Sequence, residues 1–396
     1  MKQRLQYIFL VATVLISIRL WSFQPVPSIV YNLLNILIVG LIVFMVFNFY
    51  ATGRRIGKQA FKLSVNLFLI LPLLSTLGAY VYHDQSLLAS LLALRLNFLW
   101  LLYFLLHFFN FSPAKLIKML LVIGAVWAVV TIVQQFTYPV YFFYSRDEET
   151  RQLLRAGIYR FMAFRHHYGL FLAIYAFYKF NTVQHKKVIY GAIFLLGMLG
   201  LYYFGTRQFL ASAILAVGYL IFISNKNQKG YAILLTTIIV TIGVFFSEAL
   251  FGRFIKMTQE DLSEDNIRIL AANFYLNEYW PENWFSRIIG NGLNYYDNTE
   301  YGKEVTYYEE AGLFRADVGV IGVFNLYGLF YVFASFYFVI KGLTIKYVSN
   351  SYLKAVYLAI LVTTPLSVYF DNYTAIPFFA ILAYLTDKSV LNTNIT

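Results

Sequence analysis

Arginine is the residue type with the clearest chemical pattern in this chain. Arg207 stands in the short stretch Gly205-Thr206-Arg207-Gln208 between two apolar runs, with no acidic residue near it in the sequence. Arg95 lies inside an apolar run, where an isolated guanidinium group is costly and needs an acidic partner or an anionic ligand. Guanidinium grips phosphate with two parallel hydrogen bonds, so both arginines are candidates for a phosphate site. The alternatives are a structural ion pair for Arg95 and snorkelling to the membrane interface for Arg207.

Carboxylates that could act as a general base follow later in the chain. Asp317 stands in Arg315-Ala316-Asp317, and Glu309 and Glu310 end the aromatic stretch Tyr307-Tyr308-Glu309-Glu310. A carboxylate in such a position can accept the proton of an attacking hydroxyl group. The alternative for each is a solvated loop residue.

Histidine and cysteine give no support for a metal centre. The chain has no cysteine and five histidines, of which His166 and His167 are adjacent. Adjacent side chains on a helix diverge by about 100°, so this pair lacks the spacing of a helical metal site. The sequence therefore predicts neither a metal nor a disulfide framework.

The composition defines the scaffold that must position these residues. Of 396 residues, 60% are hydrophobic and only 13% are charged. A soluble domain has about 25% charged residues, so a soluble, disordered or secreted disulfide-rich protein is excluded. The remaining class is an all-α, multi-spanning membrane protein.

Apolar runs of about 17–25 residues, long enough to cross a bilayer, predict about twelve spans in one transmembrane domain covering 1–396. They are 6–23, 28–50, 62–82, 86–109, 117–136, 166–181, 188–204, 209–225, 230–250, 317–340, 352–370 and 374–387. Two long connections remain, at 137–165 and at 251–316. Long loops on a rigid scaffold tend to carry function.

The charges predict the orientation. With both termini in the cytoplasm, every inside loop is basic, and Asp387 is the only acidic residue on that side. Such a distribution follows the positive-inside rule. The segment 251–316 then lies outside and holds eleven of the nineteen acidic residues.

Lysine and arginine are sorted between the two sides. Of sixteen lysines, fourteen are inside, whereas ten of fifteen arginines are outside, among them Arg165, Arg207 and Arg268. Orientation alone does not distinguish the two residue types. The enrichment of arginine therefore places the expected phosphate site on the outer face, with Arg165 and Arg95 as further candidates beside Arg207 and Arg268.

The large loop has internal structure in its sequence. Asp265-Asn266-Ile267-Arg268 opens a stretch of helical character that ends at Trp280-Pro281. Gly290 and Gly292 follow, and they predict a tight turn with a close approach of two backbones.

Residues 160–340 resemble the bacterial O-antigen polymerase and ligase family of membrane proteins, because several sequence features occur in the same order along the chain. The shared features are the large outer loop, the short turn with Arg207, and Arg268 at the start of the loop helix. They continue with Gly290 and Gly292, and with Asp317 followed eleven positions later by Gly328.

The resemblance implies a reaction. A glycan on undecaprenyl diphosphate is transferred to the hydroxyl of a growing glycan acceptor, the lipid diphosphate leaves, and no metal or other cofactor is needed. Arginines hold the diphosphate in this family, and on this chain they are Arg207 and Arg268. Further partners would be membrane lipid, a chain-length regulator and a flippase, and no nucleic acid is involved.

One departure bears on the type of enzyme. Ligases of this family have a His-Asn pair where this chain has Asp317-Val318. We therefore expect a polymerase of repeat units for capsule, exopolysaccharide or O-antigen in the bacterial plasma membrane. The alternatives are a ligase and a non-enzymatic polysaccharide flippase or transporter.

Overall fold

The computed structural model describes residues 2–19, 27–53, 57, 59–137, 154–155, 158–159, 166–183, 185–223, 266–295, 299–346 and 351–391. The predicted ninth span (230–250), the candidate Arg165 and most of the second outer loop (137–165) lie outside these residues. So does the first part of the large loop, 251–265.

The described chain is mainly helical, with one ladder of two residues per strand between β1 (Leu154–Arg155) and β2 (Ile158–Tyr159). The helices that run along the bundle are α1 (Lys2–Ser17), α2 (Ser28–Ala51), α3 (Lys62–His83), α4 (Leu87–Leu94), the 3₁₀ helix η1 (Arg95–Leu101), α5 (Leu102–Phe109), α6 (Pro113–Thr137), α7 (His167–Thr182), α8 (Lys187–Tyr203), α9 (Arg207–Ile223), α16 (Leu329–Thr344), α17 (Ser351–Thr363) and α18 (Ile376–Leu391). The predicted all-α class is therefore confirmed.

Four of these helical segments are long and apolar enough to cross a membrane. They are Ile29–Ala51, Lys62–His83, Leu87–Phe109 and Pro113–Thr137. Large apolar side chains also cover the outside of the bundle, as at Phe47, which is 73% exposed. A soluble protein does not tolerate such a surface, so these features indicate a membrane protein. The count of about twelve spans stays a prediction, because the other apolar helices of the described chain are shorter.

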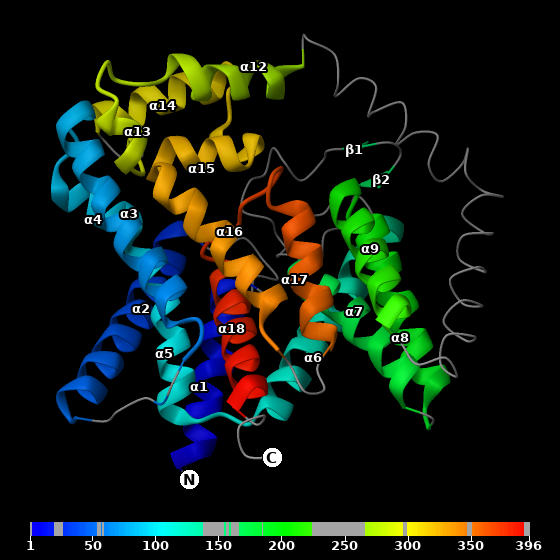
Figure 1. Cartoon of the computed structure of the whole chain (residues 1–396). Helices are drawn as coiled ribbons and strands as arrows, with labels where there is room; N and C mark the ends of the chain where they lie inside the picture. Colours follow the sequence, from blue (N-terminus) through cyan, green and yellow to red (C-terminus); the bar gives the residue numbers. More distant parts are fainter. Residues whose placement is uncertain are drawn as a thin grey trace.

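A layer of short elements covers one end of the bundle, and the two termini lie at the opposite end (Figure 1). The layer consists of α12 (Ile267–Asn273), the π-helical turn η4 (Phe274–Glu278), α13 (Phe285–Ile289), α14 (Glu300–Glu310), the 3₁₀ turn η5 (Arg315–Val318) and α15 (Val320–Tyr327). We call the covered end the loop face and the other end the terminal face. As predicted, a helix opens at Asn266, whose side chain caps it by accepting from the backbone N–H of Arg268 at 2.9 Å.

The prediction that the tenth span, 317–340, is one continuous helix is wrong. It is divided at Gly328, which has φ of +79°, into α15 within the loop layer and α16 in the bundle. A left-handed residue cannot continue a right-handed helix, and glycine adopts this conformation at least cost.

Glycines allow three backbones to cross at the break. The N–H of Gly292 donates to the carbonyl of Leu326 at 2.8 Å, and a Cβ atom added at Gly290 or Gly328 would overlap the opposite backbone. A Cβ atom at Gly78 of α3 would overlap the carbonyl of Gly290. The predicted close backbone approach at Gly290 and Gly292 is therefore confirmed, and it attaches the loop layer to α3 and to the top of α16.

The next span replaces a hydrogen bond that a proline removes from α3. Pro72 has no N–H to donate, so the carbonyl of Phe68 loses its usual helical partner. The Nδ2 atom of Asn97 in η1 donates to this carbonyl at 2.7 Å. The bond joins two neighbouring spans within their buried interface.

Small residues bring α6, α7 and α8 close together. A Cβ atom at Gly200 of α8 would lie 2.9 Å from the Cβ of Ala128 on α6, and one at Gly197 would lie 3.0 Å from the Cβ of Ala173 on α7. Lipid chains are as apolar as the helices, so close packing rather than water exclusion holds membrane helices together.

Candidate functional site

Arg207 lies where the sequence predicts it, at the start of α9. Helix α8 ends at Tyr203, Gly205 takes φ of +72°, and the chain reverses into α9. Figure 1 shows this end of α9 on the same side of the bundle as the loop layer. The Arg207 side chain is half-buried.

The turn that follows α17 joins the start of α9 to the loop layer. The Nε2 atom of Gln208 donates to Oγ of Ser367 at 2.6 Å. In the same turn, the carbonyl of Pro365 accepts from the N–H of Val320 at 3.2 Å, and Gly319 packs directly on Leu366. A continuous set of contacts therefore links Arg207 to the segment that carries Asp317.

Asp317 lies exposed in η5, and its backbone N–H donates to the carbonyl of Phe314 at 3.1 Å. Helix α12, which carries the exposed Arg268, packs beside η5 through the buried contact cluster that includes Ala271 and Val318. The hydroxyl of Tyr275 donates to the carbonyl of Leu313 at 2.7 Å and fixes the two segments together.

Glu309 and Glu310 end α14 beside the start of α12. Gly312, just after them, has the side chain of Ile267 next to its Cα position. Glu310 is exposed and Glu309 is partly buried. Arg207, Arg268, Asp317 and the two glutamates thus lie on connected elements of one face.

Arg95 does not join this group. It begins η1, and its Nη2 atom lies 3.5 Å from Oδ1 of Asn32 on α2, while Nη1 donates to the carbonyl of Leu92. The segment η1 packs mainly against α2, α3, α4, α5 and α18. The hydrogen bonds described for Arg95 are therefore with α2 and α4 rather than with the elements that carry Arg207, Arg268 and Asp317.

A buried arginine beside the site was missed as a functional candidate. Arg315 is only 5% exposed, and its guanidinium group donates to Oδ1 of Asn294 at 2.6 Å and to the hydroxyl of Tyr301 at 3.1 Å. The Tyr301 hydroxyl in turn donates to the carbonyl of Gly292 at 3.0 Å. Arg315 therefore ties the segment before Asp317 to the glycine turn.

A histidine–glutamate pair extends this network onto α3. Nδ1 of His83 lies 3.5 Å from the Glu304 carboxylate, and the imidazole stacks on Tyr301 with 3.9 Å between ring centres. The hydrogen bond with His83 lowers the pKa of Glu304 below its ordinary value, although partial burial opposes the shift. His83 ends α3 and Glu304 lies within α14, and no local sequence pattern indicates that they meet.

His166 and His167 are both buried against aromatic rings. The ring centres of His166 and His167 lie 5.2 Å and 4.9 Å from that of Tyr369. Within the described ranges, no group of three histidine or acidic side chains could hold a metal ion.

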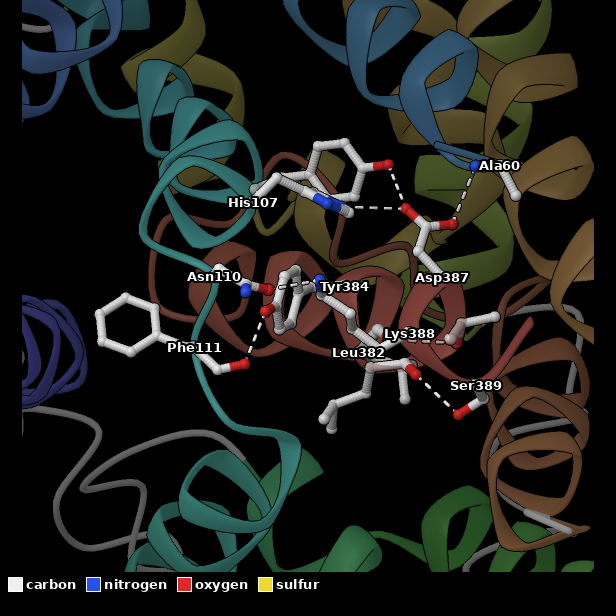
Figure 2. Close-up of polar contacts among 12 residues, drawn as sticks. Ala60, His107, Asn110, Phe111, Leu382, Tyr384, Asp387, Lys388 and Ser389 are labelled. Carbon is white, nitrogen blue, oxygen red and sulfur yellow. Dashed lines mark hydrogen bonds and ion pairs between the residues drawn. The ribbon is translucent and has the colours of Figure 1, made fainter. Parts of the chain in front are cut away.

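A second buried polar cluster lies around Asp387 of α18 (Figure 2). The Asp387 carboxylate, 1% exposed, accepts from the backbone N–H of Ala60 at 2.9 Å and from the hydroxyl of Tyr103. Nε2 of His107 lies 3.1 Å from the same carboxylate. The residue expected as a lone acid on this side is thus an internal contact between α18, α5 and the start of α3.

Comparisons with known proteins place no family on the chain. No protein-family model matches it, and no curated protein matches it significantly. The fold and the arrangement of site residues define it only as a helical membrane protein with an arginine- and acid-bearing loop face.

Proposed function

We propose that the protein is a polymerase that joins undecaprenyl-diphosphate-linked oligosaccharide repeat units. The observation that supports this most is the collection of Arg207, Arg268 and Asp317 on connected elements of the loop face. These elements are far apart in the sequence, and the turn after α17 connects the start of α9 with the segment that carries Asp317.

The proposed orientation has the loop face outside the bacterial plasma membrane. The basic inside loops and the location of both termini at the opposite end support it. Lipid-linked repeat units would then reach the site after a flippase delivers them to the outer leaflet.

The proposed chemistry is glycosyl transfer with charge stabilisation by arginine. Arg207 and Arg268 hold the diphosphate of the donor, where guanidinium groups offset the charge that develops as it leaves. The acceptor hydroxyl oxygen forms the new bond to the anomeric carbon, while the carbon–oxygen bond to the diphosphate breaks. The electron pair of that bond leaves with the lipid diphosphate.

A carboxylate takes the proton of the acceptor hydroxyl. Asp317 is the first candidate because it is exposed beside the helix that carries Arg268. Glu309 and Glu310 are the second, because the end of α14 meets the start of α12. Either group can exchange the proton with water after the glycosidic bond has formed.

A non-enzymatic flippase or transporter is the second candidate. Transporters have interrupted helices near the middle of the membrane, and the fourth span changes from α-helix to 3₁₀ helix at Arg95. A ligase would share the diphosphate site but transfer a completed polymer rather than one repeat unit.

Deletion of the gene in its host distinguishes these functions. Loss of a polymerase should leave single lipid-linked repeat units on the outer face of the membrane. Loss of a flippase should leave them on the inner face, and loss of a ligase should leave long, unattached polymers. Inner-face accumulation would contradict the proposed polymerase.

A further inference from the structure

Two arginines from different helices meet the same end of α2. The Cζ atom of Arg19, just after α1, lies 3.5 Å from the centre of the Tyr31 ring. Nη2 of Arg95 lies 3.5 Å from Oδ1 of Asn32, the next residue of α2. Both arginines therefore contact the first turn of α2, Arg19 at a buried residue and Arg95 at the exposed residue next to it.

Neither arginine has an anionic partner among the described residues. The contacts of Arg95 are two neutral oxygen atoms, those of Asn32 and Leu92, and the contact of Arg19 is an aromatic ring. The Nε atom of each is buried and has no hydrogen-bond acceptor. A buried donor without an acceptor is unfavourable, and the oxygen atoms of a phosphate group could accept from both Nε–H groups.

The backbone conformation of Arg19 is a further observation at this position. Arg19 has φ of +58°, in the left-handed position that follows α1. Glycine is the residue that takes this position at the end of a helix without steric penalty. An arginine that is held there, with its guanidinium stacked on Tyr31, is an observed outlier of the kind found at functional sites.

The exposed side chains near the two arginines are apolar and would favour a ligand with an apolar part. Ile29 and Leu33 on α2 and Leu88 on α4 are 66%, 61% and 69% exposed on the outside of the bundle. In a membrane these side chains face lipid. A ligand between the two arginines would therefore place its phosphate on the guanidinium groups and its hydrocarbon chains along these residues.

We propose that Arg19 and Arg95 form a binding site for the phosphate group of a membrane lipid, separate from the site of Arg207 and Arg268. The phosphate belongs either to a bilayer phospholipid or to a polyprenyl-diphosphate-linked molecule. The site does not depend on the proposed polymerase activity, because any anionic lipid would satisfy its charges.

Lipid-dependent thermal stability of the purified full chain tests the site. Phosphatidylglycerol, a polyprenyl diphosphate and diacylglycerol are each added to protein in a neutral detergent. We expect a rise in melting temperature with the phosphate-bearing lipids and none with diacylglycerol, because binding to the native state alone stabilises it. A stronger effect of polyprenyl diphosphate that is lost in the double variant Arg19→Gln, Arg95→Gln would identify the substrate lipid, because that variant keeps Arg207 and Arg268. A stronger effect of phosphatidylglycerol would identify a structural phospholipid. Equal effects of diacylglycerol and phosphatidylglycerol would overturn the proposal.

Substitutions locate the effect. The double variant Arg19→Gln, Arg95→Gln should weaken binding of the preferred phosphate lipid by about tenfold or more, since each loses a charged hydrogen bond. The control is Arg287→Gln, which removes an exposed loop-face arginine whose guanidinium lies 5.8 Å from the Trp280 ring. Native mass spectrometry measures bound lipid directly, and the single Lys variants serve if the double variant does not fold. Wild-type lipid retention in the folded variants would contradict the proposal.

Discussion

The Nε2 atom of His107 lies 3.1 Å from the carboxylate of Asp387, and both side chains are almost fully buried, at 4% and 1% exposed. Around this pair, the hydroxyl of Tyr384 donates to the carbonyl of Phe111 at 2.6 Å, and Nζ of Lys388 donates to Oδ1 of Asn110 at the same distance (Figure 2). The C-terminal helix α18 is thus held against the end of the fourth span by polar contacts inside an otherwise apolar bundle.

Asp387→Asn should destabilise the protein strongly. The asparagine amide places N–H donors where three donors already converge on the carboxylate. The free energy of unfolding should therefore fall by about 3–5 kcal/mol, as when other buried pairs are broken. Thermal unfolding of the purified chain, followed by the loss of monodisperse protein, measures it. The matched control is Glu300→Gln, which breaks an exposed pair with Lys303 and should change little. Equal melting of wild type and Asp387→Asn would show that the buried pair contributes nothing.

Gly328→Ala should detach the loop layer from the bundle. A Cβ atom there would overlap the backbone at Ile288, and the left-handed conformation adds strain. The free energy of unfolding should therefore fall by about 2–5 kcal/mol. Gly218→Ala in α9 is the control, because nothing lies within 4 Å of the added atom. Limited proteolysis within 266–318 reports the attachment. Wild-type resistance of Gly328→Ala would contradict the crossing described above.

The stability of the loop layer should fall in acid through Glu304. Its pKa is lowered from the ordinary 4.5 chiefly by its bond with His83, so its contribution is complete above 4.5 and is lost as the pH falls through the lower, folded value. Glu304→Gln should therefore be less stable than wild type at pH 7, and the difference should shrink below about pH 4.5. Protease resistance measured against pH tests this, with Glu300→Gln as the control. A difference that is constant with pH would rule out the carboxylate.

Periodic features of the chain were predictable, and single long-range contacts were not. Apolar runs locate the helices, because each run must be helical in a membrane whatever its neighbours are. The capped start at Asn266 and the close approach at Gly290 depend on local residue types, which the sequence displays. The break at Gly328 was missed because the residues on both sides are apolar and continue the hydrophobic run.

In the candidate site, too, features visible in the local sequence could be predicted and long-range contacts could not. The positions of Arg207 at the start of α9 and of Arg268 in α12 could be predicted, because a short turn and a capped loop helix are visible in the sequence. The pairing of His83 with Glu304 and the burial of Arg315 depend on how the loop layer folds back onto α3, which no local pattern encodes. The contacts of Arg95 with Asn32 and Leu92 could not be predicted, because position along the membrane normal does not give position around the bundle.

Arg207→Lys and Arg268→Lys should each abolish polymer while membrane expression remains normal. Lysine keeps the charge but loses the two-pronged geometry that holds a diphosphate. Polymer length and amount in complemented cells measure the effect, and Arg151→Lys, whose neighbours in sequence include acidic residues, should be mild. Normal polymer from Arg207→Lys would exclude the diphosphate role.

Asp317→Asn should leave binding of the lipid-linked donor intact and slow turnover by about 10²–10⁴-fold, the range typical of general-base loss. The amide keeps the shape of the side chain and removes its basicity. Donor binding and single-turnover rates, measured separately, distinguish this from a loss of structure. Full activity would move the role to Glu309 and Glu310, or to the leaving diphosphate as proton acceptor.

Reaction of the purified full chain with a defined undecaprenyl-diphosphate-linked repeat unit tests the central claim most directly. Polymer length and released lipid diphosphate are measured together, with a metal chelator present. The account predicts a ladder of polymers, with one lipid diphosphate released for each glycosidic bond and no inhibition by the chelator. An unchanged donor, or movement of the donor across a vesicle membrane without bond formation, would contradict it.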